Sequence, residues 1–490
     1  MAEHVARSAT AVSDAERFVA LPPRAEVANL AIVTAIFSFT FLLCYGGASA
    51  LSAYVPWRVP LALAFDERLP FMPGAALLYL SLSLALLLAP FVLRSLASLL
   101  PLFAALVLET VVAAVCFMLL PVDPPVIDCC EPGIAGALFH LADVLNLERN
   151  DLPSLHVAFA FTLAAAFAPR AGRAGTVLLY AWAVVTALST LLTRQHHLLD
   201  VAGGMTLAAL AWPIAGKWGR RPEVLAAFDV ELLCLRNCGL FIARHRRYLV
   251  VTLAVLAAAL PHWRRQRLVR TGFVFLQVVD DILDGDRPSE REPLEVAGEL
   301  IAALESGRFS NDDLGRLGTA FRADLLARGG AEGLAKAVAL VQRMRIDRER
   351  VLTARVSSET ELAELHDATF RGSLDLMLIA AESPLRASDV PELVEALGWC
   401  SAVRDLEDDL GHGLINLPRE VVDAARSESA GSDPSSWLAT LAVREWLASE
   451  RARGRALLER ADARLATFNG QRGGALLRRF ARSMRRYAAV

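Results

Sequence analysis

The sequence predicts an all-α protein in two parts, a membrane bundle of six helices followed by a soluble bundle of helices. Two observations predict this fold class. Six stretches in the first half are apolar over nearly the roughly 20 residues that a helix needs to cross a bilayer, and they cover residues 28–50, 74–93, 98–120, 154–169, 174–193 and 200–216. From residue 223 onward apolar residues recur at helical spacing, and the alternation typical of strands is scarce.

Composition separates the two parts. The chain has 490 residues, which is more than one ordinary domain holds. Hydrophobic residues make up 55% of it and charged residues 21%, so the chain is more apolar than a typical soluble protein. The excess lies between residues 28 and 216, and the remainder is rich in Arg, Glu and Asp. A formal net charge of −3 gives no reason to expect nucleic acid as a partner.

Basic residues beside the apolar stretches predict the orientation of the bundle. Arg17 and Arg24 precede the first span, Lys217 follows the sixth, and the loops on the other side contain fewer basic residues. Because basic loops stay on the cytoplasmic side, both termini are predicted to be cytoplasmic, and we place the chain in the inner membrane of the cell. The breaker-rich segment Gly216–Pro222 marks the domain boundary. The predicted parts are a cytoplasmic segment at 1–27, a membrane domain at 28–218 and a soluble domain at 223–490.

Two polar motifs lie at the predicted outer ends of the last three spans. The first ends in Ser154-Leu155-His156, and the second contains Arg194, His196 and Asp200. Ionisable residues beside the membrane core are costly, so they are candidates for function. A histidine nitrogen can attack phosphorus, a carboxylate one helical turn away can orient that imidazole, and a second histidine can protonate the leaving oxygen. The two motifs therefore suit the hydrolysis of a phosphate ester.

This pair of motifs, Pro-Ser-x-His followed by His-x-x-x-Asp, resembles the type 2 phosphatidic acid phosphatase superfamily over roughly residues 60–216. It is most similar to the branch that includes inositol phosphorylceramide synthases. The resemblance implies that His196 is the nucleophile, Asp200 its orienting partner and His156 the general acid. It further implies that Ser154 and Arg194 contact phosphate, that lipid phosphates are the substrates, and that this domain needs no cofactor.

The motifs also depart from that superfamily. Its members usually carry a basic residue six positions before the nucleophile, where this chain has Thr190. An upstream basic element is missing from the expected region, and Arg149 is the remaining candidate for that role. Two alternatives to a phosphatase therefore stay open, a catalytically inactive membrane anchor and a head-group phosphotransferase.

Aspartates form two further motifs in the soluble part. Asp280, Asp281 and Asp284 lie within one predicted helical turn, and Asp405, Asp408 and Asp409 lie in another, far along the chain. Like charges packed in one turn repel each other unless cations bind there. Magnesium prefers carboxylate and phosphate oxygens, so two such helices that face each other would hold a diphosphate through Mg²⁺. A departing diphosphate leaves a carbocation, which needs an apolar pocket that excludes water.

These motifs resemble the class I isoprenoid synthases, nearest to squalene and phytoene synthases, over roughly residues 240–425. The resemblance implies a helical bundle that acts on prenyl diphosphates, with magnesium as its cofactor. It implies that the six aspartates bind Mg²⁺ and that Arg404 and Arg371 contact diphosphate. The run Gly413-Leu414-Ile415-Asn416 lacks the arginine and aromatic residue of the head-to-head condensing enzymes, so condensation and cyclisation both stay open.

Together the motifs predict a bifunctional membrane enzyme with membrane lipids around its first domain. The predicted topology puts the histidines near the outer face and the aspartates in the cytoplasm, so direct channelling between them is not expected. Residues 476–487 pair an apolar stripe with five arginines. Such a helix either lies on an anionic membrane or docks on its own domain.

Overall fold

The computed structural model describes residues 17–122, 133–145, 150–246, 249, 252–253, 256–257, 262–429 and 433–488. Within these residues the protein is helical, and the one strand-like pairing is an isolated bridge between Val59 and Val122. The predicted all-α fold class is therefore confirmed. The chain forms two compact units, residues 1–232 and residues 233–490, which we call the N-terminal unit and the C-terminal unit. The boundary between them falls within α8 (Pro222–Arg244).

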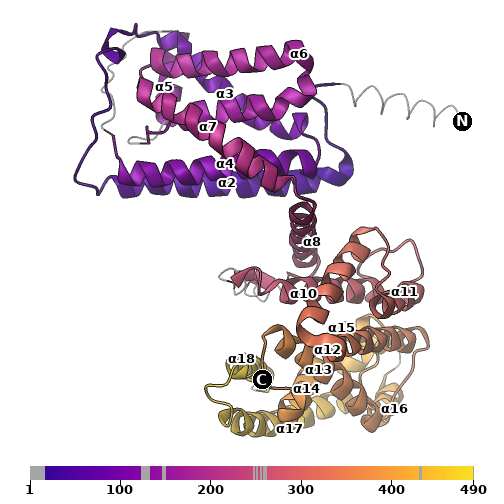
Figure 1. Ribbon diagram of the computed structural model, residues 1–490. Helices are drawn as coiled ribbons and strands as arrows, with labels where there is room; N and C mark the ends of the chain where they lie inside the picture. The colour runs from indigo at the N-terminus through magenta and orange to yellow at the C-terminus, as the bar shows by residue number, and fades with distance from the viewer. Residues whose placement is uncertain are drawn as a thin grey trace, which may run out of the picture. The chain divides into compact units, whose positions relative to one another are not determined.

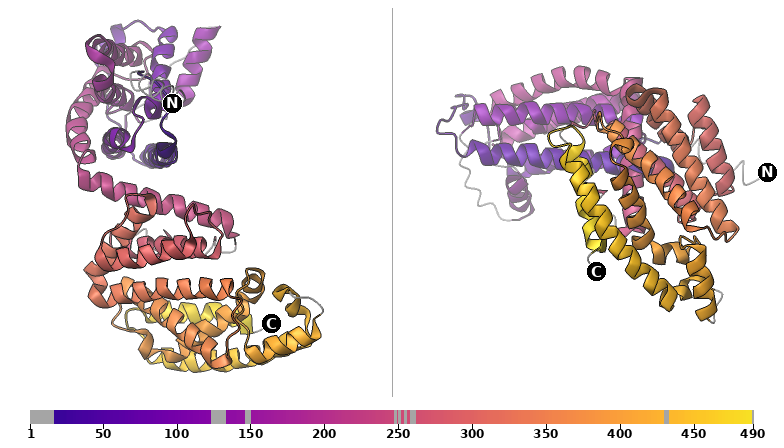
Figure 2. Two further views of the ribbon diagram at one scale, coloured as in Figure 1. Left: turned by 90° about the vertical axis from the view of Figure 1, so that its right-hand side faces the viewer. Right: turned by 90° about the horizontal axis from the view of Figure 1, so that it is seen from below.

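The N-terminal unit is a bundle of long apolar helices with nearly parallel axes (Figures 1 and 2). Its elements are α2 (Arg24–Ser52), η1 (Asp66–Arg68), η2 (Pro73–Ala75), α3 (Ala76–Val92), α4 (Leu96–Leu119), α5 (Ile134–Leu145), α6 (Leu155–Leu192) and α7 (Leu198–Gly219). Five helices among the described residues are long and apolar enough to cross a membrane, namely α2, α3 with its preceding turn, α4, α6 and α7. These helices indicate an integral membrane protein.

Helix α6 differs from the sequence prediction, which placed two separate spans at 154–169 and 174–193. The structure joins them into one 38-residue element that is broken at Gly172, where φ is 63° and ψ is −179°. Val157 and Ala187 belong to one buried cluster with Val201, although a straight helix would separate them by about 45 Å. The chain therefore reverses direction at Gly172, whose positive φ is easily adopted only by glycine.

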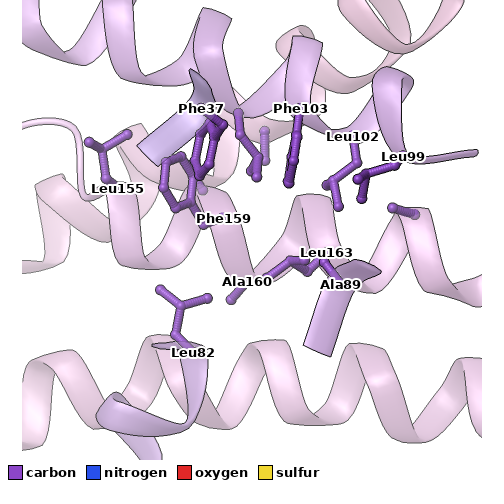
Figure 3. Packing of buried hydrophobic residues seen from close by; sticks show 14 of the residues in the cluster. Phe37, Leu82, Ala89, Leu99, Leu102, Phe103, Leu155, Phe159, Ala160 and Leu163 are labelled. Carbon is purple, nitrogen blue, oxygen red and sulfur yellow. The ribbon is translucent and has the colours of Figure 1, made fainter. Parts of the chain in front are cut away.

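Aromatic side chains fill the centre of this bundle. Phe37 of α2 stacks on Phe103 of α4 with ring centroids 4.9 Å apart, and Phe159 of α6 lies 6.3 Å from Phe37 (Figure 3). Helices α4 and α7 approach closely at Gly219, where an added Cβ would lie 2.8 Å from the Cα of Pro101. Large apolar side chains also cover the outer surface of the bundle, as lipid-facing helices require, and they include Leu42, Leu87, Val177 and Leu210.

The C-terminal unit is a second helical bundle (Figure 1). Its elements after α8 are α10 (Arg267–Asp284), α11 (Pro293–Ser306), α12 (Asp313–Leu352), α13 (Glu359–Ala380), η5 (Ala387–Asp389), α14 (Pro391–Arg404), α15 (Leu406–Gly411), α16 (Arg419–Glu428), η6 (Pro434–Ala439), α17 (Leu441–Ala466) and α18 (Gly474–Ala488). Helix α12 packs against α10, α11 and α13, and α14 packs against α13, α17 and α18. Gly330, with φ of 57°, divides α12 into two arms.

The basic C-terminal helix α18 packs against its own unit, beside α17 (Figure 2). Leu477 and Met484 are buried in the same cluster as Trp399 and Leu457. The apolar stripe predicted for this helix is therefore part of the core of the unit. Of the two alternatives for this helix, the structure favours docking on its own domain.

Candidate functional sites

The start of α6 and the start of α7 meet in the N-terminal unit. Ser154 caps α6, because its Oγ accepts a hydrogen bond from the backbone N–H of Val157 at 3.4 Å. At Gly204 of α7 an added Cβ would lie 2.4 Å from the carbonyl oxygen of Ser154, so glycine permits this close approach. The result is that His156 and His196 lie together, with ring centroids 6.1 Å apart.

His196 lies between two buried carboxylates. Its Nδ1 is 3.7 Å from Oδ2 of Asp200 and 4.0 Å from Oδ1 of Asp151. The backbone N–H of His197 donates to Oδ2 of Asp200 at 2.7 Å and holds that side chain in place. Both ring nitrogens of His196, Oδ2 of Asp151 and Oδ1 of Asp200 are buried and have no hydrogen-bond partner among the described residues. Unsatisfied buried polar atoms are rare, and a group of them marks a place where a ligand can supply the partners.

His156 contacts an aromatic residue of α3. The hydroxyl of Tyr79 lies 3.1 Å from Nδ1 of His156, and the two rings stack with centroids 3.9 Å apart. This contact engages Nδ1 and leaves Nε2 to act as the proton donor that the sequence predicts. The structure therefore brings together His156, His196, Asp200 and Ser154.

Arg194 contacts a neighbouring loop. Its guanidinium donates to the carbonyl of Leu69 at 3.3 Å and lies 5.9 Å above the ring of Phe71. Thr190, which occupies the position of the missing basic residue, is buried, and its carbonyl accepts the backbone N–H of His196 at 3.2 Å. The other candidate cation, Arg149, lies outside the described residues.

Sequence reasoning missed Tyr79 and Asp151. Burial raises the pKa of the Asp151 carboxyl to about 7, the charge of Asp200 adds to the rise, and His196 opposes it. Asn150 beside it is also buried and donates to the carbonyl of Tyr45 at 2.9 Å. Asp151 was detectable, because a carboxylate that directly precedes an apolar span is itself unusual. Nothing in the sequence indicated Tyr79.

The second candidate site is formed by aspartates of the C-terminal unit. Asp284 ends α10, and Asp409 lies in α15. Burial raises the pKa of Asp409 to about 7; the charges of Asp405, Asp284 and Asp347 add to this rise, while a hydrogen bond from Asn416 opposes it. The residue after α15, His412, contacts Asp286 after α10, so the ends of these two helices lie near each other.

The first motif shows the same crowding of negative charge. Burial and the neighbouring carboxylate of Asp284 raise the pKa of Asp280 well above its ordinary value. Burial and the charge of Asp286 raise the pKa of Asp284 to about 6, against the opposing charge of His412. The imidazole Nε2 of His412 lies 3.7 Å from Oδ1 of Asp286, and this contact joins the loop after α15 to the end of α10.

The other predicted residues of this site are placed differently. Asp281 is buried and faces α8, where Arg244 lies 2.5 Å from its Oδ2. Arg404 pairs with Asp405 at 2.5 Å. Asp408 is exposed at the surface. Arg371 pairs with Asp367 of its own helix at 2.6 Å.

Asp347 of α12 is a member of the aspartate cluster that sequence reasoning missed. Its charge acts on Asp280, Asp284 and Asp409. Arg343 and Arg350 donate to its Oδ1 at 2.6 Å and 2.9 Å. The signal was an Arg-x-x-x-Asp-x-x-Arg pattern, which puts all three side chains on one face of a helix.

Asp280, Asp284 and Asp409 are of a residue type that binds divalent cations, although among the described residues their oxygens do not lie close enough together to form a ready-made site. Asp280, Asp284 and Asp409 offer only carboxylate oxygens, which are ligands that Mg²⁺ accepts. Burial, followed by neighbouring carboxylates, raises the pKa values of all three, so each charged form is disfavoured in the absence of a cation. A bound cation would remove that repulsion.

Comparison with known proteins bears on the first site. Neither the curated proteins nor the solved structures give a match to this chain. A family model described as the PAP2 superfamily matches residues 51–214. This segment includes His156, His196 and Asp200, together with most of the apolar helices. The membrane part of the chain is therefore similar to the PAP2 superfamily, which indicates a phosphatase-type membrane domain.

Proposed function

We propose that the N-terminal unit hydrolyses a lipid phosphate or diphosphate. The observation that carries this proposal is the pair of buried histidines in a segment similar to the PAP2 superfamily, with unsatisfied polar atoms around His196. A phosphate group that entered this site would supply a partner for the ring nitrogen of His196 that does not face the carboxylates. The chain would work as a membrane enzyme on lipids that surround its helices.

Each side chain has a role in the proposed reaction. Nδ1 of His196 faces Asp151 and Asp200, so Nε2 is its free nucleophilic nitrogen. As the N–P bond forms, the P–O bond to the lipid breaks, and the leaving oxygen takes a proton from Nε2 of His156. Water then attacks the phosphohistidine and gives its proton to His156, which releases phosphate and restores both histidines. The two carboxylates stabilise the positive imidazole ring of the intermediate.

The test is phosphate release from lipid phosphates by the purified full chain in detergent. We expect His196→Asn to lower the rate by roughly 100-fold or more, because the nucleophile is lost. His140→Asn is the matched control, since His140 is exposed on α5. Equal rates for wild type and His196→Asn would support the alternative of an inactive membrane anchor.

A head-group phosphotransferase would use the same phosphohistidine. In that case an alcohol acceptor, in place of water, attacks phosphorus in the second step. Product analysis with a lipid alcohol present separates the two activities. If more transfer product than free phosphate forms, the N-terminal unit is a transferase and the hydrolase proposal is wrong.

We further propose that the C-terminal unit is a magnesium-dependent synthase that condenses or cyclises prenyl diphosphates, which makes the chain bifunctional. The carboxylates of Asp280, Asp284 and Asp409 support this proposal, because acidic side chains from two helices suit a metal-bound diphosphate. Bound Mg²⁺ would stabilise the charge of the leaving diphosphate. The aspartates of the chain would hold that ion.

A cavity adjoins Asn416, although no aspartate of the cluster lines it. Its volume is about 110 Å³, and Leu362, Val394 and Trp399 contribute apolar walls. Asn416, which also lines the cavity, donates to Oδ2 of Asp409 at 2.8 Å. Charged side chains line the cavity as well, among them Glu359, Glu395, Glu450 and Arg453. An apolar group bound there would be shielded from water on its apolar side and would be linked to the cluster through Asn416.

Incubation of the full chain with Mg²⁺ and prenyl diphosphates of different length, followed by mass spectrometry, tests the synthase. We expect a new prenyl product, which Asp409→Asn abolishes and Asp423→Asn leaves unchanged, because Asp423 is an exposed residue of α16. If no substrate length gives a product while lipid phosphatase activity is intact, the synthase proposal fails alone.

We propose an inner-membrane topology with both termini in the cytoplasm, the histidines near the outer face and the aspartates inside. Basic residues are more frequent before the first span and after the last span than in the loops on the other side, and this asymmetry supports the topology. Arg149→Cys and His412→Cys, each made after replacement of the 7 native cysteines, test it by labelling from either side of the membrane. Labelling of both positions from one side would overturn this topology.

A further inference from the structure

A histidine and two aspartates meet at the end of α10, on the side that faces α8. Asp281 is 2% exposed, and adjacent residues of a helix point about 100° apart, so Asp281 faces α8 while Asp280 faces the cluster. His245 follows the last residue of α8. Its Nε2 lies 3.3 Å from Oδ1 of Asp281 and 3.6 Å from Oδ2 of Asp286.

The end of α10 explains how Asp286 reaches this place. Gly285 adopts φ of 86°, a left-handed conformation that terminates the helix. The backbone N–H of Arg287 then bonds back to the carbonyl of Asp281 at 2.8 Å. The chain is folded over the last turn of α10, which places the side chain of Asp286 beside that of Asp281. One ligand atom from each of His245, Asp281 and Asp286 lies within 4.8 Å of the other two.

These separations are compatible with a metal site. Charge-assisted hydrogen bonds between nitrogen and a carboxylate are about 2.7–2.9 Å long. The separations of 3.3 Å and 3.6 Å at His245 are longer than that. Two ligand atoms of a tetrahedral centre, with bonds of about 2.0–2.2 Å, lie about 3.3–3.5 Å apart. The three side chains are thus spaced like ligands of a common ion.

The remaining oxygen of each carboxylate is held by another side chain. Arg244 contacts Oδ2 of Asp281 at 2.5 Å, and Nε2 of His412 lies 3.7 Å from Oδ1 of Asp286. Such outer contacts orient the ligands of metal sites and raise their affinity. Oδ1 of Asp281 and Oδ2 of Asp286 are therefore the oxygens presented to His245.

We propose that His245, Asp281 and Asp286 bind a first-row transition-metal dication, at a site that adjoins the cluster of Asp280, Asp284 and Asp409 but shares no ligand with it. Mixed imidazole and carboxylate ligands favour Zn²⁺ and its neighbours, whereas Mg²⁺ and Ca²⁺ prefer oxygen alone. Three protein ligands leave a fourth position for water or an oxygen of a bound anion. The site does not depend on the synthase activity proposed above.

Metal binding by the purified full chain tests this site. The chain is stripped with a chelator and dialysed against Zn²⁺ in a large excess of Mg²⁺, and zinc per chain is measured by mass spectrometry. The visible spectrum of the Co²⁺ form reports the coordination number of the ion. We expect one zinc per chain and a four-coordinate cobalt spectrum.

The variants separate this site from others. His245→Gln and Asp286→Asn are expected to lower the Zn²⁺ affinity by at least about tenfold. His262→Gln, which changes an exposed histidine, and Asp409→Asn, which changes the other cluster, should retain it. Asp286 lies in the turn after α10, so Asp286→Asn still tests the site if His245→Gln fails to fold. Thermal melting shows whether each variant is folded. Equal zinc content in wild type and the Asp286 variant, or displacement of the zinc by Mg²⁺, would overturn the proposal.

Discussion

His196 is enclosed by two carboxylates where sequence reasoning assigned it one. Asp200 follows at helical spacing and was predicted from its motif, whereas Asp151 belongs to the segment before α6 and faces the same Nδ1. In the same way Asp280, Asp284, Asp405 and Asp409 were found because their spacing is periodic. Residues that reach a site from a distant helix or a turn, such as Tyr79, are not related to the motif by a regular sequence spacing. They can be recognised only in the folded structure.

Asp151 should make phosphate release depend on pH. Its carboxyl has a pKa raised to about 7 by burial, so it is protonated below that pH and negative above it. The negative form stabilises positive His196, and we expect the wild-type rate to rise as pH passes through about 7. Asp151→Asn should remove this rise in rate and lower the rate about tenfold at pH 8, with a smaller effect at low pH. A pH–rate profile measures it, with Glu67→Gln as the exposed control; an unchanged inflection would contradict the assignment.

The aspartate cluster should destabilise the protein as pH rises. The folded-state pKa of Asp409 is about 7, above its ordinary value of 3.8, so folding favours the protonated carboxyl. That stabilisation is complete below pH 3.8 and is lost as pH rises towards 7. In metal-free buffer near pH 8, Asp409→Asn should therefore unfold with a free energy roughly 1–2 kcal/mol higher than wild type.

Thermal melting in detergent with and without Mg²⁺ measures this effect. Mg²⁺ should raise the melting temperature of wild type more than that of Asp409→Asn, because the ion compensates the charge that the variant lacks. Asp423→Asn, in the exposed face of α16, should melt like wild type under both conditions. An identical response of all three proteins to Mg²⁺ would argue against cation binding by Asp409.

Among the elements, α6 and α7 show what sequence patterns predict and what they leave out. The apolar length of each arm of α6 was visible, and so were the breakers near Gly172. The packing partner of each arm could not be predicted, because a helix that is apolar all round has no distinct face to indicate which helix it contacts. The contact between α6 and α7 depends on Gly204, where the missing side chain lets the two histidine-bearing segments meet.

A methyl group at residue 204 should push these helices apart. Gly204→Ala would place Cβ 2.4 Å from the carbonyl oxygen of Ser154, which the backbone can relieve only by moving. We expect a loss of about 1–3 kcal/mol in stability, together with slower phosphate release. Gly47→Ala in α2 is the control, because nothing lies within 4 Å of its added Cβ. Melting temperature and phosphatase rate measure both variants, and an active, stable Gly204→Ala would show that the contact is not needed.

At the scale of the whole molecule, two compact units carry two separate clusters of ionisable groups. Composition predicted two parts, since one half is apolar and the other charged, but it placed their boundary at Gly216–Pro222, before the end of the first compact unit at Leu232. The convergence of α10, α12 and α15 could not be predicted in detail. Asp284, Asp347 and Asp409 are far apart in sequence, and the packing that gathers them involves several intervening helices.

The two proposed activities should be lost independently. His196→Asn should abolish phosphate release and leave the prenyl product unchanged, whereas Asp409→Asn should do the reverse. The double variant should show both losses without further interaction, as expected for groups that share no contacts. Both assays on all four proteins measure this, and a loss of both activities in either single variant would show that the sites are coupled.

The docking of α18 sets an order for biosynthesis. Leu477 and Met484 complete a cluster whose other members, Trp399 and Leu457, are synthesised earlier. That cluster stays open to water until residues 474–488 have left the ribosome, by which time the apolar helices of the first 219 residues are already available for insertion into the bilayer. A nonsense mutation shortly before α18 would thus yield a chain that is anchored in the membrane yet exposes an unfinished core to cellular quality control.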